Sequence, residues 1–285
     1  MMKTLTILSL LLSINPILAQ SDIEQALFSS IGMSGFVKEA ASLKEAGAEF
    51  LTVGVPDFLN PEKSDEEFEK LLQQAKQCPL PILACNSFIR PKHLRCVGEE
   101  ANHDEVLKWA DTTFKRAKQA GVNFIVFGSS GSRKLKDGWP KEKADVQFVA
   151  LLKKMGPLAR EQNVTIVLEQ LNERECNYLT TLSESADIIR QVNDPNVRLL
   201  ADLYHMAMMN ETPQDLAKAM DVIVHIEIAE KEGRAFPGTH GEDFREFFKV
   251  LKKANYQGAI SIEGRRPEQE LSKAFTTIRE QAKES

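Results

Sequence analysis

The apolar positions along the chain fall into eight short runs, separated by longer stretches of a different period. Each run is rich in β-branched or aromatic residues and has the length of a buried strand. The stretches between them carry apolar residues three and four positions apart, which predicts amphipathic helices such as Phe244–Lys253 and Leu271–Ala282. The runs predict strands over Phe28–Met33, Phe50–Val55, Pro81–Cys85, Asn123–Phe127, Val164–Glu169, Val197–Asp202, Val222–Ile228 and Ala259–Glu263.

Residues that favour helix starts stand before several of the helical stretches. Ser64–Glu67 and Thr181–Glu184 each place a hydroxyl three residues before a glutamate, the pattern of a capping box. Thr212 followed by Pro213 predicts an N-cap and a first helical residue. Eight strands, each followed by a helix, predict an α/β fold of the (β/α)₈ TIM barrel type, in which no strand edge is left unpaired.

An open doubly wound sheet is the alternative arrangement of the same elements. Such a sheet would be expected to carry a glycine-rich phosphate turn after its first strand, and Ile31–Gly35 lacks the G-x-G-x-x-G spacing. No repeat or linker divides the chain, and Gly128–Lys141, rich in Gly, Pro and Lys, is predicted to be a long loop between a strand and a helix. We therefore expect a single barrel domain over residues 20–285.

Residues 1–19 have the pattern of a signal peptide. A positive charge at Lys3 precedes an apolar run from Leu5 to Leu12, and Pro16 and the small residue Ala19 follow. The run is too short for a transmembrane helix, and no later segment is long and apolar enough for one. We expect an exported protein, periplasmic in a Gram-negative bacterium and otherwise secreted.

The composition narrows the range of partners. The chain of 285 residues has a net charge of −5. Removal of the segment that contains Lys3 makes this −6, and there are no blocks of Lys and Arg, so the sequence does not favour nucleic acid or anionic membranes as partners. The oligomeric state stays open, and a homo-oligomer is compatible with the sequence. An oxidising compartment would permit a disulfide among Cys78, Cys85 and Cys96, and the spacing does not choose a pairing.

Acidic residues stand at or near the ends of the last four predicted strands. Side chains alternate between the two faces of a strand, so Glu169, Glu227 and Glu263 oppose their branched apolar neighbours, among them Ile166. For the seventh strand, alternation places Val224, Ile226 and Ile228 together on the outer face. Asp202 ends the sixth strand. If the apolar residues pack under the outer helices, the four carboxylates point into the mouth at the carboxyl ends of the strands.

Four carboxylates at one mouth repel one another and cannot all stay ionised without a cation. Oxygen ligands favour a hard divalent ion, Mn²⁺ or Mg²⁺, over zinc. Such a centre suits proton abstraction next to a carbonyl through an enediolate, with carboxylates moving the proton. Each residue taken singly is also compatible with a helix cap or a solvated charge, so the prediction rests on the four acting together.

The same residues resemble the xylose-isomerase-like superfamily of sugar isomerases and epimerases, from about Ser34 to Glu263. Glu169, Asn172 and Glu175 are similar to its E-x-x-N-x-x-E segment, and Asp202 with His205 to its D-x-x-H segment. The seventh-strand segment His225–Glu230, followed by Arg234 and by Pro237-Gly238, and the closing strand Ile260–Gly264 also match. One residue departs from the pattern, because Glu227 stands where many members carry a histidine.

The resemblance implies roles for these residues. Glu169 and Glu263 would be metal ligands and also the catalytic acid and base, with Asp202 as a third ligand. Glu227 would be the fourth, making the site all-oxygen, unless it turns to Arg234 or a lysine instead. His205, Arg234, Asn172 and Glu175 would bind the substrate, with Glu175 alternatively orienting His205. The resemblance leaves His225 as either a second-layer or merely a buried residue, and His93, His103 and His240 as surface or loop residues.

Three functions remain compatible with this sequence. The first is a metal-dependent isomerase or epimerase of a sugar. The second is a lyase or dehydratase that acts on a keto-sugar or keto-inositol through the same enediolate, and the third is a sugar-binding protein without catalysis. A nuclease of the same fold would need a basic face and a cluster of histidines, and the chain has five histidines. Substrate identity would depend on loop residues such as Asn86, Phe88, Arg133 and Trp139.

Overall fold

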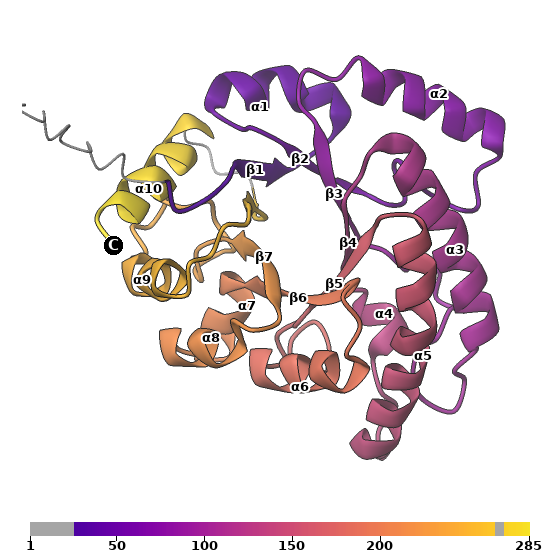
Figure 1. Ribbon diagram of the computed structural model, residues 1–285. Coiled ribbons are helices and arrows are strands. Elements are labelled where there is room, and N and C mark those ends of the chain that lie inside the picture. Colours follow the sequence, from indigo (N-terminus) through magenta and orange to yellow (C-terminus); the bar gives the residue numbers. More distant parts are fainter. Residues whose placement is uncertain (1–25, 266–270) are drawn as a thin grey trace, which may run out of the picture.

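The protein is a closed barrel of eight parallel strands in sequential order, with each strand hydrogen-bonded to the next and the last to the first. The computed structural model describes residues 26–265 and 271–285. Figure 1 looks down the ring of strands, which helices surround. This arrangement confirms the predicted TIM barrel. The strands are β1 (Ile31–Ser34), β2 (Leu51–Gly54), β3 (Ile82–Asn86), β4 (Phe124–Phe127), β5 (Thr165–Glu169), β6 (Val197–Asp202), β7 (Ile223–Ile228) and β8 (Ile260–Ile262).

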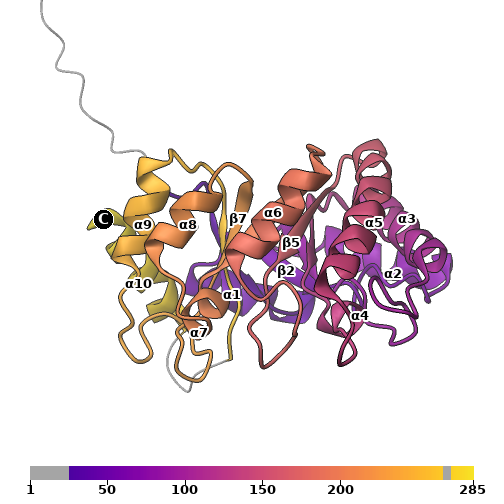
Figure 2. The same ribbon diagram turned by 90° about the horizontal axis from the view of Figure 1, so that it is seen from below.

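All eight predicted strands are present, and no end differs from its predicted position by more than three residues. The connections between them are helical, and the two short helices α4 and α7 follow the ends of β4 and β6 on the loop-rich side of the barrel (Figure 2). The helices are the 3-10 turn η1 (Val37–Glu39) and α1 (Ala40–Ala46), α2 (Asp65–Lys76), α3 (His103–Ala120), α4 (Ser130–Arg133), α5 (Lys141–Glu161), α6 (Leu182–Val192), α7 (Leu203–Met208), α8 (Pro213–Ala219), α9 (Arg245–Lys253) and α10 (Leu271–Lys283).

The barrel wall separates two apolar layers. A small cluster of Ala84, Val126, Val167 and Leu200 fills the interior. The larger core lies between strands and helices and contains Ile166 and the other branched residues of alternate parity, as strand alternation predicts. Any polar residue that shares the parity of the inner cluster therefore points into the barrel.

Val224 departs from this pattern. It was predicted to share the outer face with Ile226 and Ile228, and it packs instead against the inner cluster. The register between β6 and β7 shifts at this point, with Leu199 opposite Ile223 and Leu200 opposite His225. An extra residue in one strand breaks the strict alternation locally. Above the shift, alternation resumes, and Glu227 lies opposite Asp202.

The predicted helix starts are mostly present. Ser64 and Glu67 form the predicted capping box at the start of α2, and Thr212 caps α8 with Pro213 in its first turn. Thr181 caps α6, whereas the Glu184 side chain accepts the backbone N–H of Thr180 and is not part of a capping box.

Several other features of the chain can be placed in the structure. The segment Gly128–Lys141 was predicted to be a loop, and it contains the short helix α4. All four cysteines are free. None of the helices described is both long and apolar enough to span a bilayer. The predicted signal peptide, residues 1–19, lies outside the described residues.

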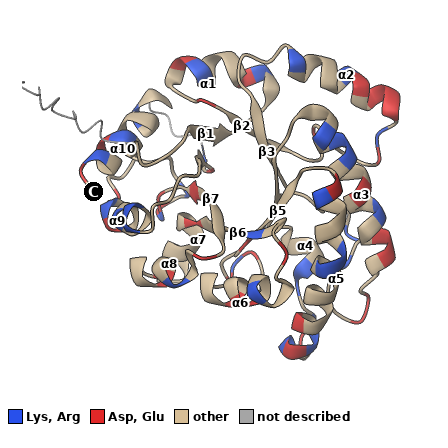
Figure 3. Cartoon of the chain, viewed as in Figure 1, with Lys and Arg blue, Asp and Glu red and all other residues tan. Residues whose placement is uncertain are grey.

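Charged residues of both signs are interspersed over the surrounding helices. Figure 3 shows that α1, α2, α3 and α5 each carry both basic and acidic residues.

Candidate metal centre

Carboxylates from four consecutive strands meet inside the mouth of the barrel. Glu169 and Asp202 end β5 and β6, Glu227 lies near the end of β7, and Glu263 follows β8. One carboxylate oxygen of each lies within 4.8 Å of those of the other three. The structure thus brings together the four residues that alternation pointed into the mouth.

Glu227 is the most buried of the four, and among the described residues it has no partner of its own. Its side chain is fully buried, and neither carboxylate oxygen has a hydrogen-bond partner within the described residues. Burial raises the pKa of Glu227 well above its ordinary value, and the charges of Glu263, Glu169 and Asp202 raise it further. A buried carboxylate without a donor is unfavourable unless a proton or a cation joins it. Glu227 does not turn to Arg234 or to a lysine.

Glu263 is held from two sides. Asn86, at the end of β3, donates from Nδ2 to Oε1 at 2.6 Å, and Arg234 pairs with Oε2. Arg234 also lies 3.3 Å from Oδ2 of Asp202. Its guanidinium stacks over the ring of Tyr204 at 4.8 Å from the centroid. Arg234 therefore supplies positive charge at the rim of the acidic cluster.

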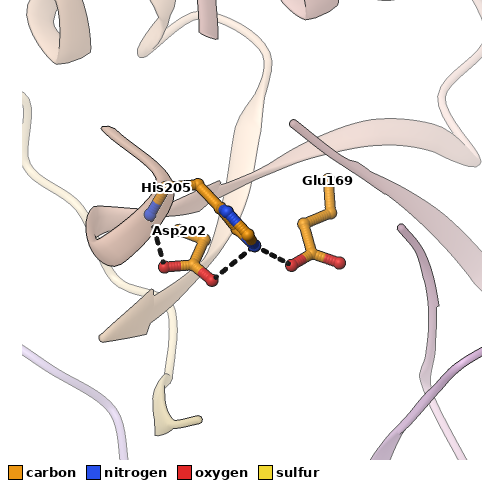
Figure 4. Close-up of side chains that lie close together, drawn as sticks. All are labelled: Glu169, Asp202 and His205. Carbon is orange, nitrogen blue, oxygen red and sulfur yellow. Dashed lines mark hydrogen bonds and ion pairs between the residues drawn. The ribbon is translucent and has the colours of Figure 1, made fainter. Parts of the chain in front are cut away.

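His205 bridges the first two carboxylates. Its Nε2 lies 3.4 Å from Oε1 of Glu169 and 3.5 Å from Oδ2 of Asp202, as Figure 4 shows. Asp202 also accepts the backbone N–H of Tyr204 and of His205, so it caps α7. Burial lowers the pKa of His205, but the charges of Asp202 and Glu169 outweigh it, and the net shift is upward.

The other ring nitrogen decides what His205 can do. The backbone N–H of Asn172 donates to Nδ1 at 3.1 Å, and the Asn172 side chain lies 2.8 Å from the same atom. In this structure Nδ1 is therefore an acceptor, and the ring carries its one proton on Nε2. Protonation of Nδ1, which the raised pKa favours, would cost the hydrogen bond from Asn172. A metal bound at Nε2 would remove the proton there and require an imidazolate as long as Nδ1 accepts this bond. Two groups lie at ligand spacing: the four carboxylates, and Glu169 and Asp202 together with His205.

The loop after β7 is held together by Glu230, a buried carboxylate outside the cluster. Glu230 accepts backbone N–H groups from Gly238 at 2.7 Å and His240 at 2.6 Å, and from Gly241 and Glu242 at longer range. Its own N–H donates to the carbonyl of Ala235, which closes the short loop that carries Arg234. Glu230 thus fixes the shape of the segment from which Arg234 reaches the cluster.

The remaining predicted residues take different places. Asn172 is buried behind the ring of His205, and Glu175 lies 3.5 Å from Nη1 of Arg234 at the exposed rim. His225 is buried below Glu227, stacked on Phe124, with no partner for either ring nitrogen among the described residues. The other three histidines, His93, His103 and His240, do not belong to the cluster.

Sequence reasoning did not assign two residues that shape the site. Asn86 had been noted only as a possible substrate contact, and its position after the third strand is the signal for a role at the mouth. Gly128 follows β4, and a Cβ built there would lie 2.2 Å from Oε2 of Glu169. No feature of the sequence predicts this contact. Phe88 and Arg133, also noted as possible substrate contacts, are fully buried, whereas Trp139 is partly exposed.

Comparison with known families agrees with this geometry. Residues 37–282 match the family model described as Xylose isomerase-like TIM barrel. The chain belongs to this family. The match covers almost the whole barrel, from the first helix after β1 to α10, so the resemblance noted at the site motifs extends over the fold.

Two relatives that resemble this chain carry the names of an inosose isomerase and a sugar epimerase. An inosose isomerase of Bacillus licheniformis is 25% identical over 86% of this chain and 90% of its own. An L-ribulose 3-epimerase of Methylomonas is 33% identical over 116 residues, a match that covers 40% of each chain. These names agree with the class of enzyme predicted from the sequence, sugar isomerase or epimerase.

Solved structures show the same fold at lower identity. The crystal structure of an Escherichia coli 3-keto-D-glucoside 4-epimerase matches with a TM-score of 0.74 at 20% identity, over 88% of this chain and 99% of that one. The IOLI protein, solved with a bound zinc atom, matches with a TM-score of 0.69 at 19% identity, over 90% of this chain and 98% of that one.

Proposed function

We propose that the protein is a divalent-metal-dependent isomerase or epimerase of sugars. The observation that carries this proposal is the set of four carboxylates, one from each of the last four strands, with ligand atoms within 4.8 Å of one another. Arg234 is their nearest guanidinium partner, so the cluster retains an excess of negative charge that a divalent cation would balance.

The residues present fit such a cation. Both oxygens of the buried Glu227 lack a partner within the described residues, so this carboxylate can bind an ion without giving up a hydrogen bond. Glu169, Asp202, Glu227 and Glu263 would hold the ion. An all-oxygen donor set favours Mg²⁺ or Mn²⁺ over zinc, which prefers nitrogen and sulfur ligands. When bound, the cation would polarise the substrate's carbonyl and neighbouring hydroxyl oxygens.

The protein's own side chains would supply the remaining chemistry. Glu169 and Glu263 approach the mouth from β5 and β8, and each would remove or return a proton on the carbon next to the carbonyl. Burial and the charge of Glu169 raise the pKa of Glu263 in the metal-free cluster, and a bound cation would lower it again and keep the carboxylate ionised, in the form that accepts a proton. Arg234 and the Nε2–H of His205 would donate to the oxygens on which negative charge develops.

Two sources of evidence suggest where to look for the substrate. The relatives act, by their names, on ketoses, keto-glycosides and inosose. The cluster is acidic apart from Arg234 and His205, which favours uncharged sugars over phosphorylated ones. We therefore propose a free ketose or keto-glycoside as substrate. Elimination from a keto-sugar uses the same proton abstraction and remains the alternative outcome of the assay.

The test is turnover by metal-depleted protein that is reloaded with Mg²⁺, Mn²⁺ or Zn²⁺. Ketopentoses, ketohexoses, 3-keto-glycosides and inosose are incubated in D₂O, and NMR follows deuterium uptake at carbon and the products. We expect metal-dependent exchange with formation of an isomer or epimer. An unsaturated product would instead identify a lyase, and binding without exchange would identify a sugar-binding protein.

Variants connect the activity to the cluster. Glu169→Gln and Glu263→Gln are each expected to abolish exchange, because both members of the acid–base pair are needed. Glu66→Gln on α2 changes an exposed carboxylate that pairs with Lys70, far from the mouth, and is the matched control. Full activity in Glu263→Gln would refute the assigned chemistry.

We also propose that the protein is exported. The proposal rests on the charge at Lys3, the apolar run that follows it and the small residue at Ala19. N-terminal sequencing of the protein recovered outside the cytoplasm is expected to begin at Gln20. Protein that stays in the cytoplasm with its first residues intact would contradict export.

A further inference from the structure

Arg133 is a buried cation to which the proposed reaction gives no role. It ends α4, and its side chain is fully enclosed. Its Nε donates to the carbonyl of Gly128 at 2.7 Å, and its Nη2 donates to the carbonyl of Glu169 at 2.9 Å. Its Nη1 has no hydrogen-bond partner within the described residues.

Enclosing a guanidinium that two neutral carbonyls hold, with no ion pair to any carboxylate of the described residues, is costly in free energy. A neutral side chain would pack there without that cost, so what the guanidinium holds in place is informative. The two carbonyls belong to the ends of β4 and β5, which are hydrogen-bonded neighbours in the barrel, with Phe127 opposite Leu168. Figures 1 and 2 show α4 beside this part of the barrel, on its loop-rich side.

Both carbonyls belong to residues that set the position of the Glu169 carboxylate. One is the carbonyl of Glu169 itself. The other belongs to Gly128, whose missing side chain leaves the space in which Oε2 of Glu169 lies, because a Cβ there would be 2.2 Å from that oxygen. A planar guanidinium fixes two acceptors at a set separation and angle. Arg133 therefore holds both the residue that carries the carboxylate and the residue against which the carboxylate lies.

We propose that Arg133 is a positioning residue for Glu169, acting on the backbone at the ends of β4 and β5. It touches neither the substrate nor the other carboxylates of the cluster. The inference deepens the proposed function and rests on it only in the role of Glu169 as ligand and proton carrier. Displacement of Glu169 would weaken cation binding and slow proton transfer, while the groups at the rim that bind substrate would stay in place.

The experiment compares Arg133→Lys and Arg133→Met with the wild type. Lysine keeps the charge but can hold only one of the two carbonyls in this geometry, and methionine holds neither. Calorimetric titration of the metal-depleted protein with Mn²⁺ is expected to show weaker binding by roughly 10- to 100-fold, as for the loss of an outer-layer partner. The kcat on the sugar that the wild type converts should fall by up to about 100-fold with little change in KM. Arg133→Met should be the more affected of the two variants.

Arg116 provides a matched control. It is also a buried arginine that holds backbone carbonyls, those of Asn60 and Lys63, but it lies on α3 away from the mouth. Arg116→Lys is expected to lower the melting temperature while the affinity for Mn²⁺ and kcat stay near those of the wild type. Equal loss of Mn²⁺ affinity in Arg116→Lys and Arg133→Lys would overturn the proposal, as would wild-type affinity in Arg133→Met.

The measurements separate this inference from the proposed function. A wild type that binds Mn²⁺ but converts no sugar contradicts the proposed function. The Mn²⁺ titrations of the Arg133 variants still test the positioning role in that case. If the wild type binds no Mn²⁺, hydrogen exchange of the amides in residues 127–131 and 168–172 decides. Faster exchange there in Arg133→Lys, and not in Arg116→Lys, supports a positioning role, and unchanged exchange refutes it.

Discussion

The two halves of the barrel contribute to the site in different ways. Strands β5 to β8 supply all four carboxylates of the cluster, each at or next to a strand end. Strands β1 to β4 supply no carboxylate to it. Their described contribution is a hydrogen bond from Asn86 to Glu263, the open space at Gly128 and the two bonds from Arg133.

The difference teaches that the acidic charge of the site comes from one half of the closed sheet, whereas the other half contributes only contacts that position the carboxylates. The second half concentrates negative charge that, as folded, is unfavourable without a cation. The first half adds no charge to the cluster and instead fixes where two of the carboxylates lie. Substitutions in the second half should therefore change what the site binds, and those in the first half how well its parts are aligned.

Glu227→Gln should give the largest change in metal affinity. It tests whether the negative charge of the second half binds the cation. Loss of an outer-layer partner already costs roughly 10- to 100-fold in metal affinity, so loss of a ligand should cost at least about 100-fold. The metal-free variant should melt at a higher temperature than the metal-free wild type, because a buried and unpartnered carboxylate is removed.

Titration with Mn²⁺ and thermal melts with and without chelator measure both effects. Glu175→Gln, at the exposed rim, is the matched control and should leave the metal-free melting temperature unchanged. A metal-free Glu227→Gln protein that is less stable than the wild type would show that the carboxylate is satisfied without a cation.

Gly128→Ala tests whether the first half aligns the second. The new Cβ would lie 2.2 Å from Oε2 of Glu169, so the carboxylate or the backbone must move. Overpacking of this kind costs roughly 1–3 kcal/mol of stability, and a displacement of about 1 Å can lower kcat by about 100-fold. Thermal melts and steady-state kinetics measure the two losses.

A second substitution isolates the cause. Glu169→Asp shortens the side chain and vacates the space that the new Cβ would fill. The double variant Gly128→Ala/Glu169→Asp should therefore lose less stability than the sum of the losses in the two single variants. Strictly additive losses in this cycle would place the harm elsewhere than at the carboxylate.

Glu230→Gln tests whether a buried carboxylate in the second half can act as scaffold alone. Four backbone N–H groups donate to the carboxylate of Glu230, and the amide of glutamine would turn its own N–H donors toward some of them. The loop that carries Arg234 should then become less ordered. We expect a rise in KM of roughly 10-fold, the equivalent of about 1.4 kcal/mol of lost binding.

Glu232→Gln changes an exposed carboxylate of the same loop and should leave KM unaltered. Kinetics of the two variants side by side decide the matter. An unchanged KM in Glu230→Gln would mean that Arg234 holds its position without this support.

Glu211 offers the smallest test, as a half-buried carboxylate outside the cluster. Burial raises its pKa to about 7 from 4.5, although the N–H of Leu182 donates to it at 2.8 Å and lowers the value. A raised pKa contributes stability that is complete below the unfolded value and is lost as pH rises through the folded value. The wild type should therefore lose stability between pH 4.5 and about pH 7.

Glu211→Gln should flatten that part of the stability curve, and chelator should leave this difference unchanged because Glu211 is not part of the metal cluster. Denaturant melts across the pH range measure it. A pH dependence equal to that of the wild type would assign the titration to other groups.

Strand alternation explains how much of the site the sequence could reveal. Glu169, Glu227 and Glu263 each oppose branched apolar neighbours, and only one packing of those neighbours keeps them from water, so the direction of the carboxylates follows from local pattern. The failure at Val224 has the same origin, because a shift in register between neighbouring strands leaves no mark in the alternation of one strand.

The sequence by itself determined the eight strands, the parity that sends four carboxylates inward and the family to which the chain belongs. Only the tertiary structure decided that Asn86 holds Glu263, that Gly128 leaves space for Glu169 and that Arg133 joins the ends of β4 and β5. The protonation of His205 also follows from a contact between segments, through the N–H of Asn172. The alternation along one strand determines which face a side chain takes. The partners of that side chain lie far away in sequence and meet it only when the barrel closes.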